Sequence, residues 1–247
     1  MKKCALLLCG GWEGHDPQGL GRLFGDILLD NDFEVYTEKD FGCFADPAYL
    51  SQFNLFVPCW SYLRGCTLED AEAIHIADAV NAGMGIAGCH GSMLDSFREN
   101  IIWQFLTGAQ WVSHPSHPFY HSSPVGDPPE GIFNVDYAVK IEDKQSPITR
   151  GLKDFRICTE QYYLHTDPSI HVLASTEFSA HDGETAPYLA SGSPIRMPIA
   201  YTRRWGKGRI FANAIGHNSD VFRHCSQALE IMRRGLLWAA DALPDDI

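Results

Sequence analysis

The sequence lacks several features that would assign it to a membrane or nucleic-acid-binding class. None of its 247 residues form an apolar run long enough to span a bilayer. The largest basic clusters are two arginine pairs, Arg203 with Arg204 and Arg233 with Arg234, and the net charge is -12. A chain of this charge offers no positive surface for phosphate groups. We therefore expect neither a nucleic acid nor a membrane as a partner.

A disulfide framework is also missing, although the chain has eight cysteines. No two of them have C-x-x-C spacing, and several lie in apolar runs, where a free thiol behaves as a small hydrophobic side chain. The first apolar run, residues 5–9, is shorter than a secretory signal requires. These observations predict a reduced, cytoplasmic protein.

The first 90 residues alternate between strand and helix patterns. Short apolar runs predict strands at 3–9, 33–37, 55–60 and 85–88, and apolar residues at helical spacing predict a helix at 20–28. A second helix follows Thr67 as its cap, with a predicted buried stripe of Ala71, Ile74, Ala77 and Val80. This order is typical of a doubly wound α/β sheet.

The second half of the chain predicts five further strands, the first of them with an antiparallel pattern. Residues 132–142 alternate strictly between apolar and polar, as a half-exposed strand does. Further strands are expected at 155–160, 171–175, 198–202 and 209–213. Helices are expected at 98–106 and 219–240, the last packing Phe222, Leu229, Met232 and Leu236. Prolines exclude helix from the loop at 111–121. With no repeat or linker, residues 1–247 are predicted to form a single domain.

The segment from Gly85 to Ser92 predicts a tight turn that presents one side chain at the carboxyl edge of the sheet. Cys89 and His90 compete for that position. In a Gly-x-nucleophile-x-Gly/Ser elbow, Gly88 and Ser92 flank His90 rather than Cys89. An imidazole at the tip favours proton transfer or metal binding, and it assigns Cys89 to packing.

Other polar side chains follow neighbouring strands. His15, Glu160 and His217 are expected at the same sheet edge as His90, where an active site would form. His15, His90 and His217 are candidate ligands for a divalent metal such as zinc. However, no HxH or HExxH spacing fixes two ligands on one element.

Several stretches together resemble the trehalose-utilization (ThuA-like) family, whose fold is similar to that of class I glutamine amidotransferases. They are residues 11–17, 88–92, 104–111, 113–115, 160–163 and 206–217. The resemblance implies a flavodoxin-like, mostly parallel sheet with added antiparallel strands, and a role in sugar catabolism. It also implies that His90 occupies the amidotransferase cysteine position, so that glutamine hydrolysis is not expected. Family members often stand beside sugar oxidoreductases, which points to keto-glycoside substrates.

Our favoured hypothesis is an enzyme that acts on a sugar or keto-glycoside. His90 would be its general acid or base and Glu160 the carboxylate partner, while His15 and His217 would hold substrate hydroxyls or a metal. The expected substrate-binding residues are Trp12, Glu13, Asp16, Gln110, Trp111, His114, Tyr162 and Asn218. Trp12 or Trp111 would stack on the sugar ring.

Two alternatives stay open. The same residues would serve a non-catalytic sugar-binding or regulatory domain, or Cys89 would be the nucleophile of a cysteine hydrolase. The apolar helix near residue 240 also raises the question of a homo-oligomer, although core packing is the preferred explanation of its pattern.

Overall fold

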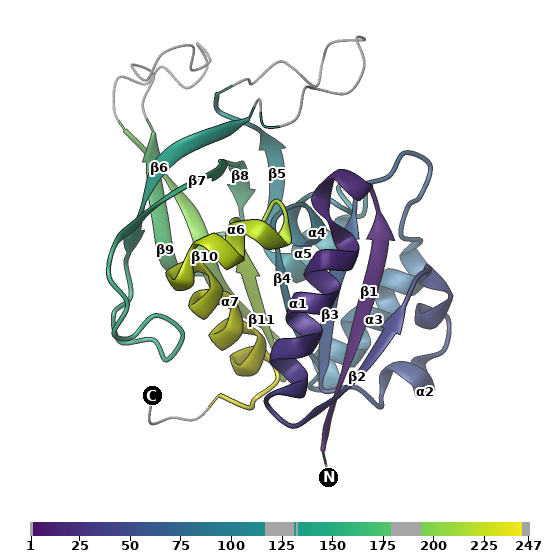
Figure 1. Ribbon diagram of the computed structural model, residues 1–247. Helices are drawn as coiled ribbons and strands as arrows, with labels where there is room; N and C mark the ends of the chain where they lie inside the picture. Colours follow the sequence, from purple (N-terminus) through teal and green to yellow (C-terminus); the bar gives the residue numbers. More distant parts are fainter. Residues whose placement is uncertain (1, 117–130, 132, 179–193, 244–247) are drawn as a thin grey trace.

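The computed structural model describes residues 2–116, 131, 133–178 and 194–243. A nine-stranded mixed sheet with the order β2-β1-β3-β4-β11-β10-β9-β6-β7 forms its centre (Figure 1). The first five strands in this order are parallel, and the remaining four are antiparallel. The fold class is therefore confirmed: a doubly wound, mostly parallel sheet extended by antiparallel strands.

The parallel half is built from β1 (Lys3–Gly11), β2 (Phe33–Glu38), β3 (Leu55–Ser61), β4 (Gly85–Cys89) and β11 (Gly208–Asn213). All residues of β3 and β4 are buried. Helices cover both faces of a parallel sheet, which is why the central strands β3 and β4 are almost continuously apolar.

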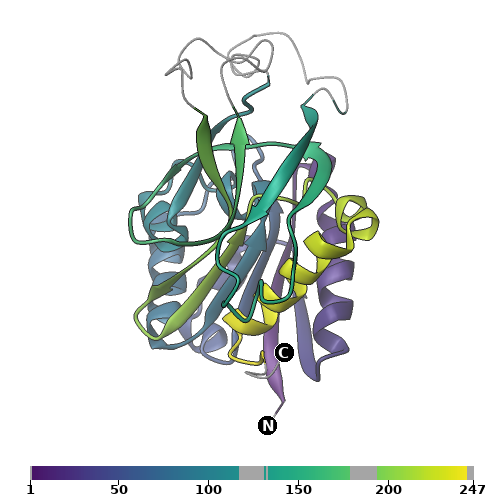
Figure 2. The same cartoon turned by 90° about the vertical axis from the view of Figure 1, so that its left-hand side faces the viewer.

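The helices form two layers (Figures 1 and 2). One layer contains α1 (Pro17–Leu29) and α7 (Ser226–Ala239), with α6 (Ser219–His224) beside them. The opposite layer contains α3 (Asp70–Ala82), α5 (Ile101–Thr107) and the short α2 (Pro47–Leu50). A five-residue helix, α4 (His90–Leu94), directly follows β4. The 3-10 turns η1 (Glu13–His15) and η2 (Phe41–Phe44) complete the described helical segments. Among the described residues, no helix is long and apolar enough to cross a membrane.

The antiparallel half contains β6 (Asn134–Ile141), β7 (Phe155–Glu160), β9 (His171–Phe178) and β10 (Ile195–Trp205). A separate two-stranded sheet pairs β5 (Ala109–Ser113) with β8 (Tyr163–Thr166). In Figure 1 this small sheet and β7 lie beyond the carboxyl ends of the parallel strands. The end of β7 thereby reaches the edge at which β1, β4 and β11 end.

Several local predictions are wrong. The buried stripe of α3 is Ala73, Ile76, Ala77 and Val80, and Ile74 is 47% exposed. The cap of α3 is Glu69, in a capping box with Glu72, rather than Thr67. The predicted final helix is two helices, because Cys225 adopts an extended conformation between α6 and α7, and Leu229 is only partly buried.

The segment after Gly108 also differs from the prediction. Residues 111–113 of the predicted loop belong to β5 rather than to a loop. Residues 114–116 form neither helix nor strand, as predicted, and residues 117–121 lie outside the described residues.

Candidate active site: a buried cluster of histidines around Glu160

The turn after β4 presents His90, not Cys89. Cys89 is the last residue of β4 and has ordinary extended dihedral angles, whereas His90 has a φ of 47°, in the left-handed region. A non-glycine residue in that region is strained, and such strain concentrates at functional sites. Cys89 is 1% exposed, and burial raises the pKa of its thiol. Its sulfur lies 3.8 Å from the carbonyl oxygen of Gly216 and packs inside the fold.

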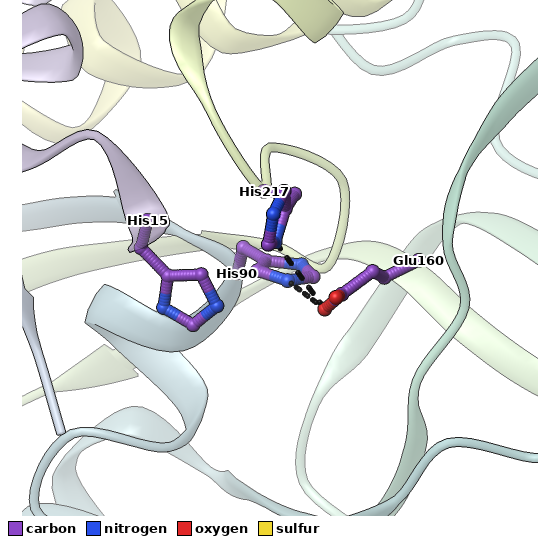
Figure 3. A group of neighbouring side chains, drawn as sticks. All are labelled: His15, His90, Glu160 and His217. Atoms are coloured by element: carbon purple, nitrogen blue, oxygen red, sulfur yellow. Dashed lines mark hydrogen bonds and ion pairs between the residues drawn. The ribbon is translucent and has the colours of Figure 1, made fainter. Parts of the chain in front are cut away.

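Three histidines and one carboxylate meet at the carboxyl edge of the sheet (Figure 3). His15 follows β1, His90 follows β4, His217 follows β11, and Glu160 ends β7. One ligand atom from each of the four lies within 4.8 Å of the others. In Figure 3 the four side chains point toward one another. The structure thus brings together all four of the residues expected to be catalytic.

His90 is held on both ring nitrogens. Its Nδ1 lies 2.9 Å from the carbonyl oxygen of Ala214, and its Nε2 lies 3.0 Å from Glu160 Oε2. A carbonyl oxygen only accepts hydrogen bonds, so Nδ1 carries a hydrogen and donates it. The ring also stacks on Tyr162, with centroids 3.9 Å apart. These contacts fix both the tautomer and the plane of the imidazole.

His15 is oriented by the neighbouring strand. Its Nδ1 lies 2.9 Å from the hydroxyl of Ser61, the last residue of β3. The ring packs so closely on α4 that a Cβ at Gly91 would collide with it. Only glycine therefore fits at position 91 while the His15 ring stays in this position.

His217 is the third histidine of the cluster. Its Nδ1 is buried and lies 3.4 Å from Glu160 Oε2, within ion-pair range, but makes no hydrogen bond with any of the described residues. A buried polar atom without a hydrogen bond is costly, and such an atom in a native structure calls for an explanation.

The electrostatics of the cluster favour an ionised carboxylate at Glu160 and neutral imidazoles at His15 and His90. Burial alone would raise the pKa of Glu160, but His114, His217 and His90 outweigh that effect and hold this pKa far below its ordinary value. Burial lowers the pKa of His90, against the opposing charge of Glu160. Burial, together with the neighbouring histidines, lowers the pKa of His15 as well. The site is therefore electron-rich, and a cation entering it would be stabilised.

Of the residues expected to bind substrate, His114 and Tyr162 lie directly against the cluster. His114 donates from Nε2 to Glu160 Oε2 over 3.0 Å, and its ring stacks on Phe133. Trp111 lies next to both, with ring centroids 5.4 Å from His114 and 6.1 Å from Tyr162, but is only 6% exposed.

Trp12 is the tryptophan that offers a ring to solvent at the site. It is 38% exposed and meets His15 edge to face, with centroids 4.7 Å apart. Between Trp12 and Trp111, the exposed Trp12 is therefore the better candidate for stacking on a sugar ring.

The other residues expected to bind substrate make contacts elsewhere in the fold. Asp16 caps α1 and accepts a hydrogen bond from Ser219, and Asn218 caps α6 by accepting from Val221. Gln110 lies in β5, and its buried side-chain oxygen has no hydrogen-bond partner among the described residues. Glu13 is exposed in η1.

Three groups that shape the site were not predicted from the sequence. Ser61 orients His15, the carbonyl of Ala214 orients His90, and Phe133 supports His114. Ser61 carries a usable signal, because it is a polar residue that ends a buried strand next to β1. A backbone carbonyl has no signal in a sequence.

The ligand atoms of the cluster match a transition-metal site in type and in spacing. Imidazole nitrogens and a carboxylate oxygen suit zinc and related divalent ions, whereas calcium and magnesium prefer oxygen ligands. The residues that would hold such an ion are His15, His90, His217 and Glu160.

Comparison with known proteins places the chain in a family. A family model described as ThuA, trehalose utilisation, matches residues 5–239. The chain belongs to this family. The resemblance inferred from the sequence motifs is thereby confirmed. No curated protein matches the ThuA chain with significance.

Solved structures share the ThuA fold. A ThuA-like protein from Parabacteroides merdae has a TM-score of 0.72 at 18% identity, covering 97% of this chain and 90% of the other. One from Bacteroides uniformis has a TM-score of 0.66 at 16% identity, with coverages of 95% and 91%. A cytoplasmic protein from Salmonella typhimurium has a TM-score of 0.57 at 12% identity, with coverages of 96% and 98%. At these identities the likeness establishes the fold alone.

Proposed function

We propose that this ThuA-family protein is an enzyme that moves a proton on a sugar or keto-glycoside. The single observation that supports this most is His90, an imidazole on a strained turn with its Nδ1 locked and its Nε2 facing an ionised carboxylate. The family description, trehalose utilisation, supports a disaccharide or its oxidised form as the substrate class.

Neutral His90 acts as the base in this proposal. A carbonyl group makes the C–H bond on the neighbouring carbon acidic, and the proton passes to Nε2 while the electron pair moves onto the carbonyl oxygen. Glu160, 3.0 Å from Nε2, stabilises the imidazolium that forms. The hydrogen bond from Nδ1 to Ala214 keeps the ring in the productive tautomer throughout. Return of the proton to carbon completes the transfer.

The remaining polar groups hold the substrate. His15 and His217 lie beside His90, with ring centroids 5.1 Å and 5.6 Å away, and would bind the enolate oxygen or sugar hydroxyls. Trp12 would stack on a sugar ring from the exposed side. Cys89 has no role, because its buried thiol is too weakly acidic to supply a nucleophilic thiolate.

Hydrogen exchange tests the proposal directly. A 3-keto-disaccharide incubated with the protein in D₂O should exchange the hydrogen next to its carbonyl, as followed by proton NMR. His90→Ala should lose this exchange by about 10²–10⁴-fold, the usual contribution of a general base. His224→Ala, which changes an exposed histidine in α6, is the matched control. Exchange at the wild-type rate in a folded His90→Ala protein would overturn the proposal.

A sugar-binding domain without catalysis is the second candidate, and it predicts a different pH dependence. Recognition alone needs no titrating pair, so affinity for the sugar would be nearly constant between pH 5 and pH 8 and no hydrogen exchange would occur. Calorimetric titration of the sugar across this range, run beside the exchange assay, separates the two.

A further inference from the structure

We propose that His15, His90, His217 and Glu160 form a binding site for one divalent transition-metal ion such as zinc. The inference concerns binding and goes beyond the proposed reaction. It rests on the geometry of the four side chains and on the hydrogen bonds around them.

The spacing of the ligand atoms fits a single ion. Zinc binds nitrogen and carboxylate oxygen at about 2.0–2.2 Å, so the ligand atoms of a tetrahedral site lie roughly 3.4 Å apart. Glu160 Oε2 lies 3.0 Å from His90 Nε2 and 3.4 Å from His217 Nδ1. All four atoms lie within 4.8 Å of one another, so small side-chain movements would close them around the ion.

The tautomer of His90 leaves a place for a cation. Because Nδ1 donates its hydrogen to Ala214, neutral His90 has a lone pair on Nε2, and this lone pair faces the carboxylate of Glu160 at 3.0 Å. Two acceptors at this distance repel each other unless a positive charge lies between them. Either a proton or a metal ion would supply that charge.

His217 favours the metal ion over a proton. Its Nδ1 is buried 3.4 Å from the same carboxylate oxygen and has no hydrogen-bond partner within the part of the chain that the structure describes, so a proton between His90 and Glu160 would leave it unsatisfied. An ion at the centre would bind His217 as well as His90 and Glu160. A single cation between Glu160 Oε2, His90 Nε2 and His217 Nδ1 would then bind all three atoms.

The hydrogen bonds that orient the candidate ligands also resemble those that orient metal ligands in proteins. A histidine that binds a metal through one nitrogen commonly donates from the other nitrogen to a fixed partner. His90 does so to Ala214, and His15 lies 2.9 Å from the Ser61 hydroxyl through Nδ1, which leaves Nε2 for the ion. His114 donates to Glu160 and orients the carboxylate in the same way.

Three imidazoles and a carboxylate select the class of ion. Magnesium and calcium prefer sets of oxygen ligands, whereas zinc and its neighbours bind imidazole well. We therefore expect Zn²⁺ and Co²⁺ to bind and Mg²⁺ and Ca²⁺ not to compete at equal concentration.

The test is metal binding by the full chain after it has been stripped with a chelator and dialysed. Calorimetric titration with ZnCl₂ and elemental analysis after gel filtration should both give one ion per chain. Co²⁺ should give the visible absorption of a site with nitrogen and oxygen ligands, and Zn²⁺ should abolish it. Ser61→Ala, which leaves all four ligands in place, should weaken zinc binding about 10–100-fold. His217→Ala should weaken it more.

His224→Ala and His171→Ala are the matched controls, because both histidines are exposed and belong to other surfaces. Circular dichroism checks the fold of each variant. Absence of stoichiometric zinc in the wild-type chain would overturn the proposal, as would unchanged binding in a folded His217→Ala protein. These readouts need no substrate. Zinc binding by a protein that shows no hydrogen exchange even in its stripped, metal-free form would refute the proposed reaction and leave the metal site standing.

Discussion

The carboxylate of Asp16 accepts hydrogen bonds from both the hydroxyl and the backbone N–H of Ser219, over 2.5 Å and 3.3 Å. Asp16 directly follows His15, and Ser219 lies two residues after His217. Asp16 also caps α1 by accepting from the N–H of Gly19. One side chain therefore ties together two of the three segments that carry histidines of the cluster.

Asp16→Ala should separate these loops and weaken the site without removing any of its members. We expect both zinc affinity and hydrogen exchange to fall about tenfold, which corresponds to roughly 1.4 kcal/mol. The lost helix cap should cost about 1 kcal/mol of stability. Asp46→Ala removes the comparable cap of α2, where Asp46 accepts from Ala48, and is the matched control. Equal loss of activity in both variants would show that Asp16 acts through stability alone.

Gly91→Ala tests whether the position of His15 matters. A Cβ at residue 91 collides with the His15 ring, so the ring must move away from the cluster. Alanine is otherwise favoured over glycine inside a helix, by roughly 0.5–1 kcal/mol. We therefore expect a folded protein with weakened zinc binding and slower exchange. Gly25→Ala in α1 is the control, because its new Cβ would meet only ordinary contacts at 3.8 Å and 3.9 Å. Wild-type binding in Gly91→Ala would mean that His15 is dispensable.

Cys89 should be chemically inert. Its thiol is buried and burial raises its pKa, so iodoacetamide should label the exposed Cys158 well before Cys89. Peptide mapping by mass spectrometry after timed labelling measures the order. Cys89→Ala should keep hydrogen exchange within a few-fold of the wild type. Loss of exchange in proportion to Cys89 labelling would instead support the cysteine hydrolase.

The sequence was sufficient to predict the parallel half of the sheet and the edge at which the site forms. Strands that are buried on both faces have continuous apolar patterns, and their carboxyl ends meet, which brought His15, His90 and His217 together. Glu160 was harder to place, because the antiparallel β7 lies at the far end of the sheet order. It contacts His90 because β7 passes beyond the carboxyl ends of the parallel strands and ends there at Glu160 (Figure 1).

Side-chain burial within a helix was less predictable. Ala73 and Ile74 are adjacent in α3, yet Ala73 is buried and Ile74 is 47% exposed. Small residues along a helix fit either face, so the pattern of α3 did not fix its rotation. Likewise, nothing in the sequence shows that the carbonyl of Ala214 would hold His90, because every residue has such a group.

The two proposals together predict that bound zinc inhibits the proposed reaction. The base in the proposed reaction is the lone pair on His90 Nε2, and the same lone pair binds the ion. A bound ion therefore excludes the proton, and one equivalent of zinc should abolish hydrogen exchange by the stripped protein. Excess chelator should restore it, and Mg²⁺ should have no effect.

The magnitude of this inhibition discriminates between two roles of His90. If exchange falls in step with zinc occupancy, as measured by calorimetry on the same samples, His90 transfers the proton and zinc regulates the site. If the zinc-loaded protein exchanges faster than the stripped protein, His90 serves the reaction as a ligand. The ion would then polarise the substrate carbonyl, and another group would have to take the proton. Ser61→Ala should require a 10–100-fold higher zinc concentration for the same effect in either case, because it changes the affinity of the site and leaves His90 in place.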